Sequence, residues 1–282
     1  MKSILKYAGG KSKEIPSFRE HIPNQYDTYI EPFLGGGAVF FHLEPEKAIL
    51  NDKNQKLIQF YREVRNSYSE LSKELTDLGN VYKVNQLDYM QRKALTPDKR
   101  VPNANEKLYY DMRKQFNYPD GTYIHGTVYY FINKTAYSGM IRYNKSGEFN
   151  VPYGHYANFN PDIVTKEHSE LLQRAELYNT DYEEIFSKTT AKDFMFLDPP
   201  YDCVFNSYGN NDIPDGFSED EQRRLAENFK NLSCRTLMII GKTPLIEELY
   251  KDYIVDEYDK NYSVNIRNRV KASQIHVIIK NF

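Results

Sequence analysis

The stretch Thr28-Tyr29-Ile30-Glu31-Pro32-Phe33-Leu34-Gly35-Gly36-Gly37 decides the fold of this chain of 282 residues. Residues 28–31 favour a short strand that ends at Pro32, and the three glycines turn the chain toward a helix expected at 38–43. Ala48-Ile49-Leu50 predicts a second buried strand, closed by Asn51-Asp52. A strand, a glycine turn, a helix and a second strand form the opening of a nucleotide-binding α/β sheet.

The remaining strands are expected late in the chain, at residues 194–197, 236–240 and 274–279. A helical pattern begins at Gln55 and continues to Phe116, with loops at 95–98 and 101–103. A capping box at 218–221 begins another helix through Leu232, and residues 143–149 resemble a β-hairpin with its turn at 145–147. We therefore expect a parallel sheet, formed by residues 1–58 and 161–282, split by a helical domain at 59–160.

The formal net charge of −2 argues mildly against a nucleic-acid partner, but the charge is unevenly distributed. Residues 121–147 and 260–282 contain no acid, and they carry these basic residues: Lys134, Arg142, Lys145, Lys260, Arg267, Arg269, Lys271 and Lys280. The pattern indicates either a basic face or chance clustering on a solvated surface.

Only two cysteines occur, Cys203 and Cys234, which excludes a disulfide framework and a cysteine-rich zinc site and indicates a reducing compartment. We expect no signal peptide and no membrane span, and hence a cytoplasmic protein.

The sequence Asp198-Pro199-Pro200-Tyr201 directly follows an apolar strand, where the ligands of such sheets bind. Two prolines fix the backbone and remove two N–H donors, which leaves a carboxylate, carbonyl acceptors and an aromatic ring. This set suits a planar aminated base, whose amine donates to Asp198 and to the Pro199 carbonyl while Tyr201 stacks on the ring. Accepting both N–H bonds draws the nitrogen lone pair out of conjugation, so that it can attack a methyl group. As an isolated tetrapeptide the same sequence is a turn after a strand.

Two glycine-containing segments suggest the other half of a site. In the first, glycines at 35–37 allow the backbone to approach a ligand, and Asp52 is placed to accept from ribose hydroxyls. Phe40 stands where a dinucleotide fingerprint requires glycine. In the second, Leu5 stands where a phosphate-binding P-loop requires glycine, so Lys11 is interpreted as a cation near a carboxylate or phosphate.

Several ordered blocks together resemble the Dam-type (D12 class) adenine-N6 DNA methyltransferases over nearly the whole chain. The blocks are residues 5–11 (Leu-Lys-Tyr-Ala-Gly-Gly-Lys), 31–37, 51–52, 138–144 (Ser-Gly-Met-Ile-Arg-Tyr-Asn), 147–154 (Gly-Glu-Phe-Asn-Val-Pro-Tyr-Gly), 181–182 (Asp-Tyr) and 198–201. The resemblance implies a Rossmann-like methyltransferase sheet with an inserted helical DNA-recognition domain. It further implies transfer from S-adenosylmethionine to the N6 amine of an adenine flipped out of double-stranded DNA.

The resemblance also assigns residues. Those expected to act on the base are Asp198, Pro199 and Tyr201. Those expected to hold the cofactor are Tyr7, Lys11, Phe33, Gly35, Gly37, Asp52, Phe159, Asp181, Tyr182 and Asp198, with Asp181 accepting from the adenine amine and Phe159 packing on that ring. Those expected to contact DNA are Lys6, Lys134, Tyr137, Ser138, Met140, Arg142, Asn144 and Lys145. No metal site is expected, and the transfer requires none.

The chain departs from the family pattern at several positions. Tyr7 replaces the usual Trp, Ser138-Gly139-Met140 replaces Asn-Gly-Leu, and Gly241-Lys242 replaces a Ser-Asn pair. These differences leave the catalytic assignment in place but leave the target sequence open. A cognate restriction endonuclease is a possible partner. The alternatives are an enzyme that modifies RNA or a protein amide, and a DNA-binding protein without catalysis. Asp198 argues against a protein-glutamine enzyme, and Lys11, Asp52 and Asp198 together argue against a non-catalytic protein.

Overall fold

The computed structural model describes residues 1–201, 217–261 and 273–282. The long segment at 202–216, which contains Cys203, lies outside the described residues. So do Arg267, Arg269 and Lys271, so the proposed basic face at the end of the chain is described only in part.

A seven-stranded sheet forms the centre of the molecule, in the order β3-β2-β1-β4-β5-β7-β6. The strands are β1 Tyr29–Glu31, β2 Ala48–Asn51, β3 Ala175–Tyr178, β4 Phe194–Leu197, β5 Arg235–Gly241, β6 Ile254–Asn261 and β7 Ser273–Lys280. The strands β1 to β5 pair in parallel, whereas β7 pairs antiparallel with both β5 and β6. The prediction of a parallel sheet is therefore wrong for the edge formed by β7 and β6. Residues 262–272 make too short a connection for the crossover that a parallel β6–β7 pair would need.

The central strands β1 and β4 are buried on both faces, and their side chains alternate between two apolar clusters. Phe194 and Phe196 of β4 face one cluster, and Met195 and Leu197 face the other. The first face is covered by α1 (Ile15–Phe18), α2 (Ala38–Leu43), α3 (Gln55–Asn66) and α7 (Lys166–Leu172). The second is covered by α8 (Tyr182–Phe186), α9 (Glu219–Lys230) and α10 (Pro244–Tyr250).

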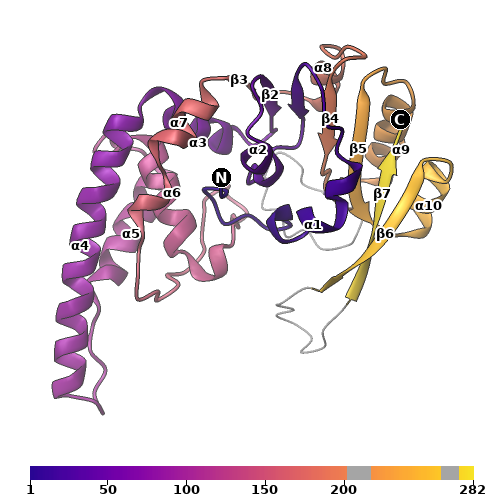
Figure 1. Cartoon of the computed structure of the whole chain (residues 1–282). Helices are drawn as coiled ribbons and strands as arrows, with labels where there is room; N and C mark the ends of the chain where they lie inside the picture. The colour runs from indigo at the N-terminus through magenta and orange to yellow at the C-terminus, as the bar shows by residue number, and fades with distance from the viewer. Residues whose placement is uncertain (202–216, 262–272) are drawn as a thin grey trace.

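A layer of three helices extends from the first face: α4 (Tyr68–Leu95), α5 (Ala104–Asn117) and α6 (His125–Thr135). Figure 1 shows that the far end of α4 projects away from the sheet. The loops predicted at 95–98 and 101–103 separate α4 from α5. The expected domain boundary at residue 58 falls inside α3, and one apolar cluster runs from the sheet through α3 into these helices.

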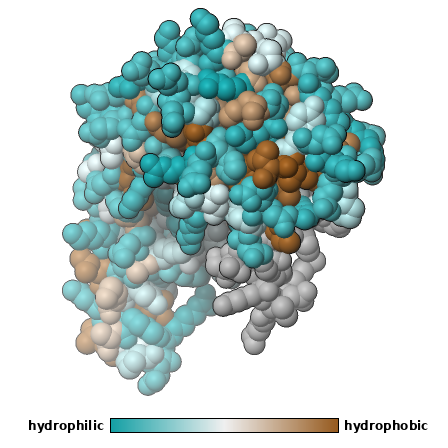
Figure 2. Space-filling model, turned by 45° about the vertical axis from the view of Figure 1, so that its right-hand side comes forward, coloured by the Kyte–Doolittle hydropathy of each residue, from teal (hydrophilic) through white to brown (hydrophobic). Residues whose placement is uncertain are grey.

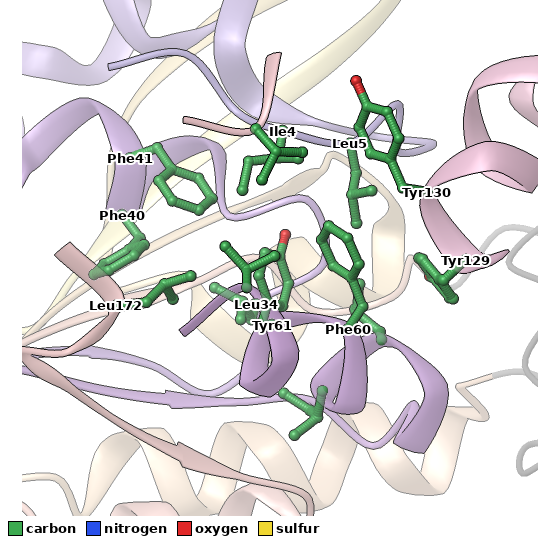
Figure 3. Packing of buried hydrophobic residues seen from close by; sticks show 14 of the residues in the cluster. Ile4, Leu5, Leu34, Phe40, Phe41, Phe60, Tyr61, Tyr129, Tyr130 and Leu172 are labelled. Carbon is green, nitrogen blue, oxygen red and sulfur yellow. The ribbon is translucent and has the colours of Figure 1, made fainter. Parts of the chain in front are cut away.

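The N-terminal segment joins the two parts. Ile4 and Leu5 are buried beside Tyr130 of α6, as Figure 3 shows. The Asn133 side chain accepts from the Lys6 backbone N–H at 2.9 Å and donates to the Lys6 carbonyl at 2.8 Å. Asn133 thus binds Lys6 as a neighbouring strand would, and this fixes the segment that leads to Tyr7 and Lys11.

The surface in Figure 2 is mainly hydrophilic, with small hydrophobic patches, some of them on the projecting end of α4. Val84, Leu87 and Met90 of α4 are more than half exposed. Within the described ranges, no helix has the length and apolar character needed to cross a membrane.

Candidate active site

Three carboxyl groups lie at the carboxyl ends of three neighbouring parallel strands. Glu31 ends β1, while Asp52 and Asp198 immediately follow β2 and β4. Because neighbouring parallel strands end at one edge of the sheet, these groups share the edge at which open α/β sheets bind their ligands.

Lys11 connects Asp198 to Tyr201. Its side chain is only 2% exposed, and its Nζ lies 2.5 Å from Asp198 Oδ1 and 2.9 Å from the Tyr201 hydroxyl. Nζ also donates to the Gly9 carbonyl at 3.0 Å. The three donor positions of an ammonium group are thus directed at a carboxylate, a phenol and a carbonyl. The interpretation of Lys11 as a cation beside a carboxylate is confirmed, and the pair joins residues 187 positions apart.

Burial and the Lys11 ammonium act on the pKa of Asp198 in opposite directions, and the neighbouring Glu31 is deeply buried. Burial raises the pKa of Asp198, and the Lys11 ammonium opposes that rise. Burial also raises the pKa of Glu31, to about 8; the hydrogen bond from Tyr29 lowers it, and the charge on Asp198 raises it further. Glu31 is therefore mainly protonated at neutral pH, so Asp198 faces no second full charge from β1.

The glycine loop packs around Tyr7. A Cβ atom on Gly35 would lie 2.8 Å from the Tyr7 ring, and one on Gly36 would lie 2.9 Å from the Tyr7 Cβ. Gly35 also has a φ of +47°, which side chains rarely adopt. Positions 35 and 36 therefore require glycine partly because Tyr7 packs closely against them. The sequence analysis does not predict this contact.

Asp52 fixes the same loop through backbone donors. Its carboxylate accepts from the Gly35 N–H at 2.9 Å and from the Asn54 N–H at 2.8 Å. Burial raises the pKa of Asp52, and these two N–H groups oppose the rise. The preceding Asn51 donates to the carbonyls of Pro32 and Thr180, and so connects the glycine loop with the loop that leads to Asp181.

Asp181, Tyr182 and Phe33 form a second group at this edge. The rings of Phe33 and Tyr182 lie 5.3 Å apart. Asp181 caps α8 by accepting from the Glu183 N–H, and it pairs with Arg224 at 3.2 Å and with Lys53 at 3.4 Å. The structure thus brings together Tyr7, Lys11, Phe33, Gly35, Gly37, Asp52, Asp181, Tyr182 and Asp198 on strand-end loops and on the N-terminal segment that contacts them.

Phe159 lies elsewhere. Its ring contacts Tyr82, Tyr130 and Phe131 in the helical layer, and its side chain is 8% exposed. The hypothesis that Phe159 packs on the cofactor adenine has no support from these contacts. The Phe33–Tyr182 pair is the aromatic group that stands beside Asp181.

Two lysines expected at the DNA are largely engaged within the protein. Lys134 Nζ donates to the Ile4 carbonyl at 2.5 Å, and burial together with the charge on Lys6 lowers the pKa of Lys134 to about 8. Lys6 Nζ donates to the Lys134 carbonyl at 3.3 Å and lies 4.1 Å from the centre of the Tyr156 ring. Lys134 therefore anchors the N-terminal segment, and a phosphate contact from it conflicts with this geometry.

The other residues expected at the DNA lie around an exposed turn. Tyr143 and Phe149 form one antiparallel bridge pair, shorter than a regular hairpin, and the Gly147 N–H donates to the Asn144 carbonyl. Asn144 Oδ1 accepts from the backbone N–H groups of Ser146 and Glu148. Asn144 therefore shapes the turn, while Lys145 at its tip is exposed.

The guanidinium of Arg142 donates to the Asn150 side chain at 2.9 Å on the outside of this turn. Nearby, the Tyr137 side chain is 48% exposed, Ser138 has a φ of +55°, and Met140 packs against the core.

A model of the D12 class N6 adenine-specific DNA methyltransferases matches residues 7–266 of the chain. This chain belongs to that family. It is 35% identical over 291 residues to the type II methyltransferase M.CviBI of Paramecium bursaria Chlorella virus NC1A, with all of both chains covered. It is 33% identical over 298 residues to the type II methyltransferase M.MjaIII of Methanocaldococcus jannaschii, covering 98% of this chain and 93% of the relative. It is 32% identical over 234 residues to a DNA adenine methylase of Vibrio cholerae, covering 80% and 75%.

The family confirms that this D12 methyltransferase is an enzyme that methylates adenine in DNA at specific sites, and that its reaction needs a methyl donor. Four residues make contacts near the site that the sequence analysis does not predict: Glu14, Asn133, Arg224 and His276. Each is polar, and Glu14, Asn133 and His276 are buried. Each has side-chain partners more than 40 positions away, although Arg224 also pairs with Glu221 three positions away, so no local pattern in the sequence indicates these distant contacts.

Proposed function

We propose that this D12 methyltransferase moves a methyl group from S-adenosylmethionine to the N6 amine of an adenine flipped out of double-stranded DNA. The observation that supports this most directly is the Lys11–Asp198–Tyr201 group at the end of β4. It combines a buried cation, a hydrogen-bond acceptor and an aromatic ring next to two rigid prolines. The same group argues against a DNA-binding protein without catalysis.

In the proposed mechanism, Asp198 and the Pro199 carbonyl accept the two N–H bonds of the amine, while Tyr201 stacks on the base. Both acceptors favour a pyramidal nitrogen with an available lone pair. Lys11 opposes the effect of burial on the pKa of Asp198 and so favours the ionised carboxylate. After transfer, the methylated amine loses a proton to Asp198 or to water. Catalysis then depends on positioning and on these hydrogen bonds, without a strong base.

The residues at the strand ends fit the proposed cofactor. Each oxygen of Asp52 accepts one backbone N–H, which leaves further acceptor capacity for ribose hydroxyls. The Phe33 and Tyr182 rings offer apolar faces beside Asp181, an acceptor for an adenine amine. S-adenosylmethionine, when bound, supplies an electrophilic methyl group on sulfur. Tyr7, Lys11, Gly35 and Gly37 complete the proposed binding set.

The helical layer and the turn at 142–150 are the proposed DNA-recognition part, corresponding to residues 59–160. Arg142 and Lys145 reach solvent there, and Tyr137 is placed to fill the gap that a flipped base leaves. We further propose a cognate restriction endonuclease with the same recognition sequence, because two relatives are named type II methyltransferases. A cytoplasmic location agrees with the free thiol of Cys234.

The test begins with expression in a host that lacks adenine methylation, followed by sequencing of its DNA for N6-methyladenine. Methylation at one short sequence, absent with Asp198→Ala, is the expected result. The purified protein is then supplied with labelled S-adenosylmethionine and with duplex DNA, RNA or a protein extract. Label in RNA or protein, with none in DNA, would overturn the proposal.

A further inference from the structure

A second buried polar cluster lies behind the Lys11–Asp198–Tyr201 group, between the N-terminal segment and the strands β6 and β7. Its centre is Glu14, which is 6% exposed and stands between the short helix Lys11–Lys13 and α1. Glu14 accepts from the Tyr258 hydroxyl at 2.8 Å, and it forms an ion pair with Lys260. Its Oε2 also lies 2.8 Å from His276 Nδ1.

This cluster reaches the proposed base-binding site through His276. The imidazole is fully buried on β7, and its ring meets the Tyr201 ring edge-on, with centroids 5.3 Å apart and an angle of 85°. The imidazole also packs against the Tyr258 ring, with centroids 5.6 Å apart and an angle of 67°. Glu14 therefore contacts an imidazole that packs against two tyrosine rings, and one of these belongs to the sequence Asp198-Pro199-Pro200-Tyr201.

A second route leads from Glu14 to Lys11. The Glu14 N–H donates to the Lys11 carbonyl at 2.7 Å, and the Lys11 side chain bonds the Tyr201 hydroxyl. Tyr201 is thus held at its ring by His276 and at its hydroxyl by Lys11, and both of these residues contact Glu14.

Glu14 is a fixed charge at any pH at which the enzyme is expected to work. Burial alone raises its pKa, but the contact with His276 and the charges on Lys11 and Lys260 lower it to about 2. A buried ion pair of this kind is weak support for stability, because desolvation offsets most of the attraction. The position of this cluster beside Tyr201 explains its presence better than a contribution to the stability of the fold does.

We propose that Glu14 and His276 are positioning residues that hold the Tyr201 ring in the orientation needed to stack on the flipped base. The proposal rests on the proposed role of Tyr201. Neither residue contacts the substrate in this scheme, so both act through Tyr201 and Lys11. Their loss is expected to reduce kcat while leaving the KM for DNA nearly unchanged, because the Tyr201 ring meets the base only after flipping.

The test compares Glu14→Gln, which keeps the size but removes the charge, with His276→Phe, which keeps a ring but removes the nitrogens. Glu20→Gln is the matched control, because Glu20 is an exposed acid on the same segment. Each protein is assayed on a duplex that carries the sequence found methylated in the host. The target adenine is then replaced by 2-aminopurine, whose fluorescence reports flipping and stacking against an aromatic ring.

We expect both variants to reduce kcat by roughly 10- to 100-fold, with the KM for DNA within about twofold of wild type. We also expect the 2-aminopurine signal to change at saturating protein, while Glu20→Gln behaves as wild type. Unchanged kcat and fluorescence in both variants would overturn the proposal, and so would a fall in kcat that Glu14→Asp, which restores the charge, does not partly reverse.

A Glu14→Gln protein that fails to fold leaves His276→Phe as the deciding variant. The wild-type protein separates this inference from the proposed function. No methyl transfer by the wild type refutes the function, whereas an active wild type with unaffected variants refutes only the positioning role.

Discussion

Asp198 and Arg142 are both residues that the sequence marks for contact with the target, but their surroundings differ in every physical respect. Asp198 immediately follows a central strand and pairs with a lysine 187 positions away, in a region where burial raises the carboxyl pKa. Arg142 lies on an exposed turn, and its described bonds go to Asn150, eight positions away. Asp198 is thus positioned by contacts between distant parts of the fold, whereas Arg142 is positioned by residues close to it in the sequence.

This difference indicates how the two parts are expected to respond to mutation. A change at the strand edge disturbs buried charges that depend on each other, so its effects are large and concern the reaction itself. A change at the turn alters exposed side chains that we propose to contact DNA, so its effects are expected to be smaller and to concern the choice of sequence. Each prediction below tests one side of this contrast.

The largest effect is expected from Asp198→Ala. We expect a loss of methyl transfer of roughly a thousandfold, about 4 kcal/mol of barrier, because one of the two acceptors of the amine is removed. Tritium transfer from labelled S-adenosylmethionine to DNA measures it. Asp198→Asn is the companion variant, since it keeps an oxygen for Lys11 and so avoids leaving that cation alone. Activity within about tenfold of wild type in both would remove Asp198 from the mechanism.

Lys11→Met is expected to act through the protonation of Asp198. The Lys11 charge lowers the pKa of Asp198, and its removal raises that pKa further above the ordinary range. Because the proposed mechanism uses the ionised form of Asp198, activity is expected to be lost as pH falls, and in Lys11→Met the loss is expected to begin at a higher pH. We expect kcat/KM to drop by roughly 10- to 150-fold near neutral pH, corresponding to about 1.5–3 kcal/mol for a charged hydrogen bond.

The measurement for Lys11 is the pH dependence of kcat/KM. Lys13→Met is the control, because Lys13 is an exposed cation on the same short helix. A Lys11→Met enzyme whose activity falls equally at all pH values would show that Lys11 does not act through Asp198. Calorimetric binding of S-adenosylmethionine separates a lost cofactor contact from the protonation effect.

The strand edge and the regions around the turn also differ in how much of their structure the sequence predicts. The strands β1, β2, β4, β5 and β7 and the helices at 38–43 and 219–230 follow from local patterns that the structure confirms. The strand β3 escaped prediction because it is short and has an exposed Glu176, and β6 escaped because Asp256, Glu257 and Asp259 interrupt its apolar pattern. Charged residues are typical of an edge strand, which β6 is.

Side-chain contacts between segments that are distant in the chain could not be predicted from the sequence. Lys134 looked like a phosphate ligand because it stands in an acid-free stretch, yet its ammonium bonds the carbonyl of Ile4. Phe159 looked like a cofactor contact, yet it packs into the helical layer. A sequence pattern gives the type of an element and its buried face, but it does not indicate which distant group a long polar side chain will meet.

Arg142→Ala tests whether the turn reads a base. We expect Arg142→Ala to weaken recognition of the preferred sequence by about 1–3 kcal/mol and to reduce discrimination at one base pair. The reason is that arginine contacts guanine through two donors. Lys145→Ala is the comparison: it should weaken binding evenly across sequences and lower the salt slope by about one. Methylation of a randomised duplex library by both variants measures this. An unchanged sequence preference with Arg142→Ala would place base reading elsewhere.

The smallest effect is expected from Asn144→Ala, which tests whether the turn is held locally. Asn144 Oδ1 accepts two backbone N–H groups of the turn, and its amide donates to Glu148. Each such bond contributes about 0.5–1.5 kcal/mol, and both N–H groups can turn to water when the side chain is lost. We therefore expect weaker discrimination between DNA sequences, with little change in Tm or in kcat on the preferred site. Ser146→Ala is the control, because it retains the backbone N–H that Asn144 accepts. A large fall in Tm with Asn144→Ala would mean that the turn is coupled to the fold as strongly as the strand edge is, and the contrast between the two regions would not hold.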